Sequence, residues 1–249
     1  MQNEPGKELS HKRRITPPDT KTMFDKKQVK PAAILLYTVL AATVWKYFAF
    51  PHFEAEPALA DFWKGATPLL AALVLFGLIP MGIVKWGFRE RLADYGLRIG
   101  IAYRTLRTFL LAVPIIIGMA VLTGHNPAFY EVYPLNETIR PQHAEIGVAL
   151  FAVHVICYLG YYFGWEFLFR SFVQQGLSER CGRTTAVLVQ TTASAMLHYG
   201  HPVGEVFGAI IGGLVWGFLA YRTRSILSGL GQHALLGIVL DGILIFDRN

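Results

Sequence analysis

The sequence predicts an all-α fold, a polytopic bundle of about seven transmembrane helices. Hydrophobic residues make up 53% of the 249 residues and charged residues only 16%, whereas an ordinary soluble domain carries about 25% charged residues. The apolar residues also form long continuous blocks, which soluble helical proteins avoid. Two cysteines suggest neither a disulfide framework nor a metal knuckle. The net charge of +6 resides mostly in loops, so no nucleic-acid partner is expected.

Residues 1–30 form a polar tail before the first apolar block. The tail holds eight Lys and Arg against four Asp and Glu. It lacks the apolar core of a signal peptide, so we expect a cytoplasmic segment. Two interpretations stay open: the tail rests on anionic lipid, or it is a disordered, positively charged segment.

The predicted spans follow from the apolar blocks, which lie at about 31–50, 66–86, 108–123, 147–177, 184–199, 203–221 and 226–246. The fifth block is short for a span. Basic loops alternate with acidic or neutral ones, the basic ones being 1–30, 85–107, 178–183 and 222–224. By the positive-inside rule, this alternation places the N-terminus in the cytoplasm and the C-terminus outside. Helical spans of this kind indicate the cell inner membrane.

Polar groups are distributed unevenly among the blocks. The first three blocks hold few charges except near their ends, whereas the later ones carry several ionisable side chains. We therefore divide the chain after its tail into a scaffold of transmembrane helices, residues 31–146, and a site-bearing transmembrane core, residues 147–249.

The stretch Tyr161–Arg170, YYFGWEFLFR, places two charges inside an apolar block. A charge at the membrane centre costs on the order of 3 kcal/mol on insertion scales. Glu166 and Arg170 are four residues apart, so on a helix they share a face and can partly neutralise each other. The pair is either part of a functional site or a structural ion pair that locks helix packing.

Five further polar residues in or beside these blocks are candidates, namely His198, His201, Glu205, His233 and Asp241, with His154 a turn or more upstream of the Glu166 stretch. His198 is either a site residue or a core histidine bonded to a backbone carbonyl, and His233 either belongs to the site or starts a helix near the headgroups. His201 precedes Pro202 and suits a turn. Glu205 suits the first turn of the next helix, or it faces His198 across the break. Asp241 is a candidate support residue.

These residue types fit two kinds of chemistry. A carboxylate and a histidine within reach of one water can position it and take its proton, and a second histidine can donate to the oxyanion that forms. The same set, a Glu with two or more His, can instead hold zinc or another divalent metal. The soluble-type zinc motif HExxH is absent from the sequence.

Helix length raises a question about depth. At about 1.5 Å per residue, Glu166 and His198 both lie roughly 20 Å from their cytoplasmic turns, whereas His233 lies only about 10 Å from its own. Either the seventh helix begins with an extended segment through Gly229 and Gly231, or helix tilt closes the gap.

Residues 147–246 resemble the CPBP family of intramembrane proteases, the CAAX proteases and bacteriocin-processing enzymes, also called the ABI family. The family motif Glu-Glu-x-x-x-Arg matches Trp165-Glu166 through Arg170, Phe-x-x-x-His matches Ser194 to His198, and His-x-x-x-Asn or Asp matches His233 to Gly237. The connecting stretch Gly212–Ile226 resembles the Gly-rich helix and Arg-Ser-Ile turn of the family.

Three positions depart from the family pattern. Trp165 stands where the family has its first Glu, which is implicated in activating water, Ser194 replaces Phe, and Gly237 replaces the Asn that helps the oxyanion. Two rescues are open: Glu166 takes over water activation, or Glu205 supplies the missing carboxylate.

The resemblance implies an intramembrane endopeptidase that hydrolyses a peptide bond of a membrane-associated protein or peptide. Glu166 and His198 would activate water, His233 would stabilise the oxyanion, and Arg170 would orient Glu166. A metal held by Glu166, His198 and His233 is an alternative, because the family has been described both as metalloproteases and as glutamate-dependent enzymes. The rival hypothesis is a non-catalytic relative, a membrane scaffold or an immunity or binding protein.

Overall fold

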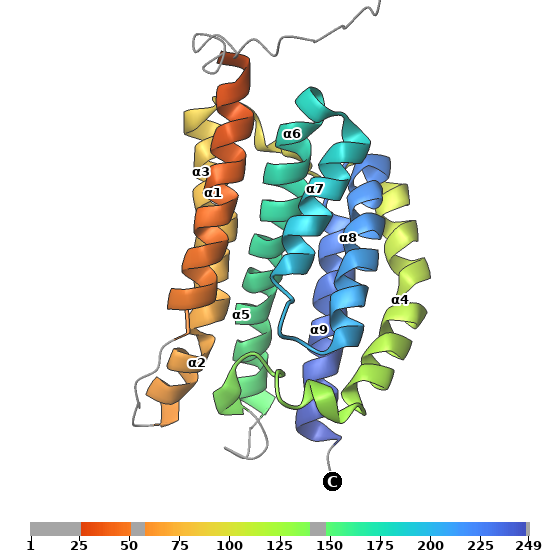
Figure 1. The fold of residues 1–249 in the computed structure, drawn as a ribbon. Helices are drawn as coiled ribbons and strands as arrows, with labels where there is room; N and C mark the ends of the chain where they lie inside the picture. Colours follow the sequence, from red (N-terminus) through yellow and green to blue (C-terminus); the bar gives the residue numbers. More distant parts are fainter. Residues whose placement is uncertain (1–25, 51–57, 140–147, 248–249) are drawn as a thin grey trace, which may run out of the picture.

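A bundle of long helices makes up the computed structural model, which describes residues 26–50, 58–139 and 148–247 (Figure 1). The long helices are α1 (Lys26–Phe48), α4 (Ala102–Gly124), α5 (Val148–Glu166), α7 (Arg183–Met196), α8 (Val203–Thr223) and α9 (Leu227–Phe246). Within these ranges no strand forms. The predicted tail lies largely outside the described residues.

Two of the rods contain π-helical turns. The first rod joins α2 (Ala58–Ala72), η2 (Leu73–Leu78), α3 (Ile79–Gly82) and η3 (Ile83–Gly87). The second joins α5, η7 (Phe167–Val173) and α6 (Gln174–Cys181). Short 3₁₀ turns fill the connections, namely η4 (Leu92–Tyr95), η5 (Pro127–Phe129) and η6 (Glu137–Ile139).

The length and composition of the helices confirm the predicted membrane bundle. Six described helices are long and apolar enough to cross a membrane, namely Gln28–Phe48, Ala60–Gly87, Ala102–Gly124, Val148–Cys181, Val203–Thr223 and Leu227–Phe246. The 14-residue α7 is not among them, although its block, short for a span, was counted as the fifth of about seven. Large apolar side chains such as Leu111 and Leu122 remain exposed on the outside, where lipid rather than water is their natural solvent.

Aromatic packing joins α1 and the first rod to the second rod. The rings of Trp45 and Phe76 lie 6.0 and 5.9 Å from the ring of Trp165. Gly164 allows close approach here, because a Cβ at that position would collide with the backbone of Ala72. The rod α5–α6 is thus held firmly at the level of Trp165 and Glu166.

The expected scaffold helices lie on both sides of the α5–α6 rod. Figure 1 shows α1 to α3 on one side and α4 on the other, where α4 packs against α9. The backbone near Gly96 and Ile101 is hydrogen-bonded to Ile226 and Thr223. The basic loop after the first rod is therefore fastened to the turn between α8 and α9.

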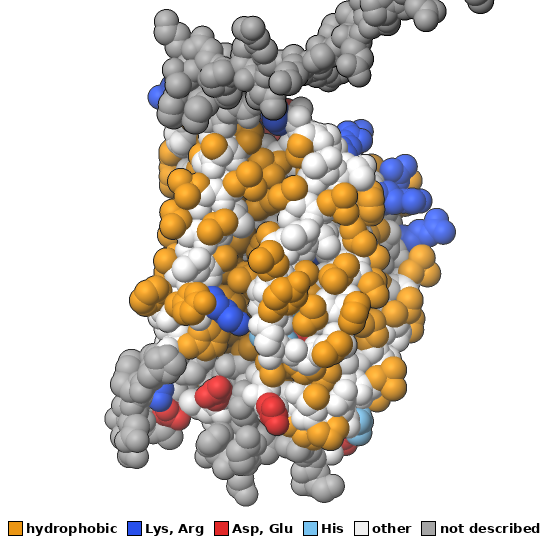
Figure 2. All heavy atoms as spheres, viewed as in Figure 1, with side chains coloured by type: hydrophobic (Ala, Val, Ile, Leu, Met, Phe, Trp, Pro, Cys, Tyr) orange, Lys and Arg blue, Asp and Glu red, His pale blue; other side chains and the backbone are white. Residues whose placement is uncertain are grey.

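Charged side chains gather at the two ends of the bundle. On the face drawn in Figure 2, most Lys and Arg side chains lie at one end, and the Asp and Glu side chains lie toward the other. The long surface between them is mainly hydrophobic. This arrangement agrees with the alternating loops of the sequence, and the orientation in the membrane stays a prediction.

The structure removes one of the two explanations for the different depths of Glu166 and His233. The helix α9 begins at Leu227 and runs unbroken through Gly229 and Gly231, so the extended segment offered as one alternative does not form. The π-helical stretch η7 lies between Glu166 and the end of α6. A π turn holds more residues than an α turn and therefore rises less per residue, which accounts for a small part of the difference in depth. The alternative of helix tilt stays a prediction.

Candidate functional site

Glu166 is the last residue of α5 and Arg170 lies in the π-helical stretch that follows. Both side chains are almost wholly enclosed, and Arg170 Nη1 lies 3.4 Å from Glu166 Oε1. Single π turns inside α-helices occur frequently at functional sites. The sequence predicted the shared face of the two residues but not the π turn.

His233 of α9 reaches across to Glu166. Its Nδ1 lies 2.9 Å from Glu166 Oε1, and since a carboxylate oxygen only accepts, Nδ1 carries the proton. The imidazole lies between two rings, with centroid distances of 4.6 Å to Tyr162 and 4.5 Å to Trp216. The guanidinium of Arg170 lies 5.5 Å from the centroid of Trp216. His233 is therefore held in one orientation.

His198 lies just after α7, with its ring against Trp165 at 5.3 Å. Its Nδ1 donates to the backbone oxygen of Ser194 at 2.9 Å, which fixes the proton on that nitrogen in the neutral ring. Its Nε2 lies 3.8 Å from Glu205 Oε1. The backbone hydrogen bond expected for a core histidine and the position opposite Glu205 thus occur together.

Glu205 turns its side chain away from the helix axis and toward three polar groups. Its Oε1 accepts a hydrogen bond from the hydroxyl of Tyr133 at 2.6 Å and from Nδ1 of His201 at 2.9 Å. Burial and the nearby Glu205 carboxylate raise the pKa of Tyr133 well above its usual value, so the phenol remains a donor. The helix-dipole interpretation of Glu205 is therefore incomplete, because Glu205 also faces His198 across the break.

The two carboxylate–imidazole pairs lie in one region of the bundle. His198 and His233 are close enough to interact electrostatically, and so are His233 and Glu205. Trp165 contacts His198 and is the chain neighbour of Glu166. The structure thus gathers Glu166, His198 and His233, with Arg170 and Glu205 beside them.

Asp241, the expected support residue, forms a buried pair of its own. Its Oδ2 lies 2.8 Å from His154 Nε2, and both side chains are fully enclosed. The ring of His154 lies 5.2 Å from Tyr158, which in turn packs 4.6 Å from Tyr162. Asp241 therefore borders the site through aromatic rings.

The three positions that depart from the family motifs, Trp165, Ser194 and Gly237, pack closely against neighbouring side chains. Trp165 Nε1 donates to Ser194 Oγ at 3.2 Å, so two departing positions contact each other. At Gly237 an added Cβ would collide with the hydroxyl of Tyr162. No signal in the sequence singled out Tyr133, because a loop residue carries no periodicity that could connect it with Glu205.

The predicted metal set is not assembled as a ligand cluster. In the described part of the chain, no three His, Cys, Asp or Glu side chains are grouped so that they could hold a metal ion. Glu166 with His233 and Glu205 with His198 stand instead as two pairs. The described residues in this arrangement do not fit a zinc centre.

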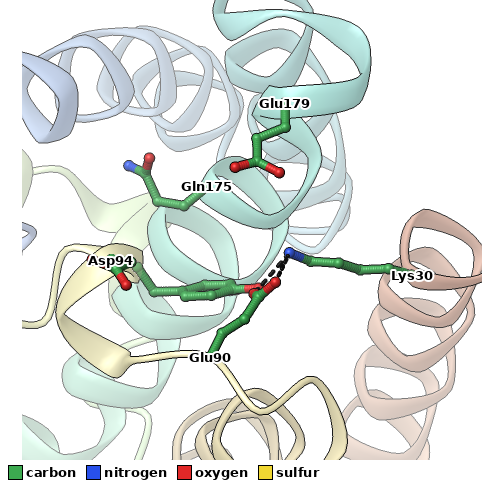
Figure 3. A pocket seen from close by; sticks show the side chains of 6 residues that line it. Lys30, Glu90, Asp94, Gln175 and Glu179 are labelled. Atoms are coloured by element: carbon green, nitrogen blue, oxygen red, sulfur yellow. Dashed lines mark hydrogen bonds and ion pairs between the residues drawn. The ribbon is translucent and has the colours of Figure 1, made fainter. Parts of the chain in front are cut away.

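A second polar region lies around α6, away from the candidate site. A cavity of about 230 Å³ is lined there by Lys30, Glu90, Asp94, Tyr95, Gln175 and Glu179, and Figure 3 shows these side chains. Lys30 Nζ lies 2.7 Å from both carboxylate oxygens of Glu90, and the hydroxyl of Tyr95 donates to Glu90 at 2.6 Å. Partial burial acts to raise the pKa of Glu90, but these hydrogen bonds outweigh it and lower the pKa below its usual value.

A comparison with protein families matches the part of the chain that carries the candidate site. The model of the Type II CAAX prenyl endopeptidase Rce1-like family matches residues 146–239. No curated protein and no solved structure matches the chain. The matched segment contains Glu166, His198 and His233. The resemblance predicted from the motifs is therefore confirmed over residues 146–239, where this integral membrane protein is similar to the Rce1-like family.

Proposed function

We propose that the protein is an intramembrane endopeptidase that hydrolyses a peptide bond of a membrane-associated protein or peptide. The observation that carries the proposal is the gathering of Glu166, His198 and His233, which come from separate segments of the chain. A polar group inside a membrane bundle is costly and is by default a functional-site hypothesis. The family match supports a protease fold around it.

The proposed chemistry divides into two tasks. One carboxylate and His198 position a water and take its proton. His233, when protonated, donates through Nε2 to the oxyanion, while Glu166 balances its charge across the 2.9 Å contact. Arg170 orients Glu166 by its ion pair. Either Glu166 or Glu205 is available as the carboxylate that acts on the water.

A comparison of membrane peptide profiles tests this function. Cells with the wild-type chain and cells with His198→Ala should differ in a small set of membrane-derived peptides. Glu131→Gln supplies a matched control, because Glu131 is an exposed loop residue. Identical profiles for wild type and His198→Ala would contradict the proposal.

The second candidate is a non-catalytic relative that acts as a membrane scaffold or binding protein. The contact between Trp165 and Ser194 and the filling of Gly237 by Tyr162 favour it, because these positions are used for packing. It predicts that Trp165→Phe changes stability and partner binding and that no variant of His198 changes the peptide profile.

The charges of the loops suggest where the protein is located and how it is oriented. We propose the cell inner membrane, with the N-terminus in the cytoplasm and the C-terminus outside, from the alternation of basic loops. Reporter fusions at residues 101 and 131 should then report opposite sides of the membrane. The same side for both would contradict this topology.

A further inference from the structure

Glu205 is held in place while one of its oxygens remains unused. Tyr133 and His201 both donate to Oε1, at 2.6 and 2.9 Å. Oε2 is buried and has no hydrogen-bond partner among the residues that the structure describes. A buried oxygen without a partner is costly, and a water molecule or a catalytic role is the usual reason for one.

His198 presents a second acceptor to the same space. Since its Nδ1 donates to Ser194, Nε2 of the neutral ring carries a lone pair. Nε2 lies 3.8 Å from Glu205 Oε1, which is too long for a hydrogen bond between them. Both groups accept and neither donates to the other, so a water molecule, which has two O–H bonds, is the species that satisfies both.

Glu166 is less suited to act on water. Its side chain is fully enclosed, whereas those of Glu205 and His198 are 13% and 12% exposed. Its Oε1 is shared by His233 and Arg170. A Cβ placed on Gly229 would lie 3.3 Å from its Oε2, so that oxygen faces the backbone of α9. Water reaches Glu205 more readily than Glu166.

We propose that Glu205 is the general base of the reaction and that His198 positions the water; this assignment rests on the proposed function. The water donates one hydrogen to His198 Nε2 and the other to the Glu205 carboxylate. As its oxygen bonds to the substrate carbonyl carbon, its proton passes to Glu205 and the carbonyl electron pair moves to the oxygen. The C–N bond then breaks, and the proton on Glu205 passes to the leaving amine.

Three variants test the assignment on the peptide that the wild type cleaves and His198→Ala does not. Glu205→Gln keeps the acceptor oxygen for Tyr133 but loses the base, so the cleavage rate should fall at least about 100-fold with little change in KM. Sodium formate should raise the rate of Glu205→Ala, because formate fits the vacated space and replaces the carboxylate. The same salt should leave the cleavage rate of Glu166→Ala unchanged.

The outcomes separate the two proposals. A wild-type rate in Glu205→Gln overturns the assignment of the base and leaves the endopeptidase intact. Formate rescue of Glu166→Ala but not of Glu205→Ala overturns it as well and assigns the base to Glu166. If wild type and His198→Ala produce the same peptides, both proposals fall. Thermal unfolding of each variant in detergent shows whether a lost rate reflects a lost fold.

Discussion

Trp165 donates its indole N–H to the hydroxyl of Ser194 at 3.2 Å, and both residues are buried. The two positions lie on different helices and both depart from the family motifs. Trp165 also lies against His198 and within the aromatic cluster around Trp45. The large indole of Trp165 donates to the small hydroxyl of Ser194, so the two substitutions relative to the family motifs form one packed, hydrogen-bonded pair.

Ser194→Ala should destabilise the protein by about 1–3 kcal/mol, because it leaves the buried N–H of Trp165 without an acceptor. Trp165→Phe should lower the free energy of unfolding by less in the Ser194→Ala protein than in the wild type. A double-mutant cycle measures the difference. Thr67→Ala is the control, because its hydroxyl bonds a backbone oxygen on the exposed surface. Additive unfolding free energies would contradict the coupling.

Glu166→Gln should destabilise the fold by about 3–5 kcal/mol, because it leaves the enclosed guanidinium of Arg170 without its counter-ion. It should also lower cleavage, since His233 loses the carboxylate that orients it. The double variant Glu166→Gln with Arg170→Met should be more stable than Glu166→Gln alone. Unfolding in mixed micelles compares the three proteins, and a double variant no more stable than the single one would contradict the ion pair.

Gly237→Ala should destabilise the bundle by about 1–3 kcal/mol, because the new methyl group collides with the hydroxyl of Tyr162. Gly118→Ala in α4 is the matched control, because a Cβ there meets nothing within 4 Å. That substitution should be neutral or stabilising by about 0.4–1 kcal/mol. Equal melting temperatures for the two alanine variants would argue against the packing of Tyr162 on α9.

The ion pair between Lys30 and Glu90 should contribute a pH-dependent increment of stability. The lowered pKa of Glu90 means that the folded state favours the carboxylate. The increment is therefore present above the ordinary glutamate pKa of about 4.3 and is lost as the pH falls through the lower folded value. Lys30→Met should cost roughly 0.2–1 kcal/mol at pH 7, since the pair is partly exposed.

Thermal unfolding of Lys30→Met and wild type from pH 7 to pH 3 checks this prediction. The difference between the two proteins should shrink as the pH falls below about 4.3. A difference that stays constant over that range would mean that the ammonium contributes through its cation–π contacts with Phe88 and Tyr95 rather than through the Glu90 carboxylate.

Composition and apolar block length were enough to predict the bundle and most of its spans, because a bilayer imposes length and apolarity on each helix separately. The pair of Glu166 and Arg170 was predictable for a similar reason, since four residues on one helix fix a shared face. The π turns were not, because they depend on packing between rods rather than on a local pattern.

The candidate site was predictable only in part. His198 and Glu205 were separated by a visible chain break, so their facing each other was one of two open alternatives. The contact of His233 with Glu166 joins residues 67 positions apart, and no periodicity encodes that pairing. Tyr133 comes from a loop, and Asp241 was expected near the site without its partner His154.

Hydrolysis itself can be followed with oxygen-18 water. The purified protein, reconstituted in liposomes, is incubated in this water with membranes from cells that lack it. The account predicts new peptide C-termini that carry the heavy oxygen with wild type and with Glu131→Gln, and none with His198→Ala. The same labelled C-termini with His198→Ala, or none with wild type, would contradict the claim that this bundle is an intramembrane endopeptidase.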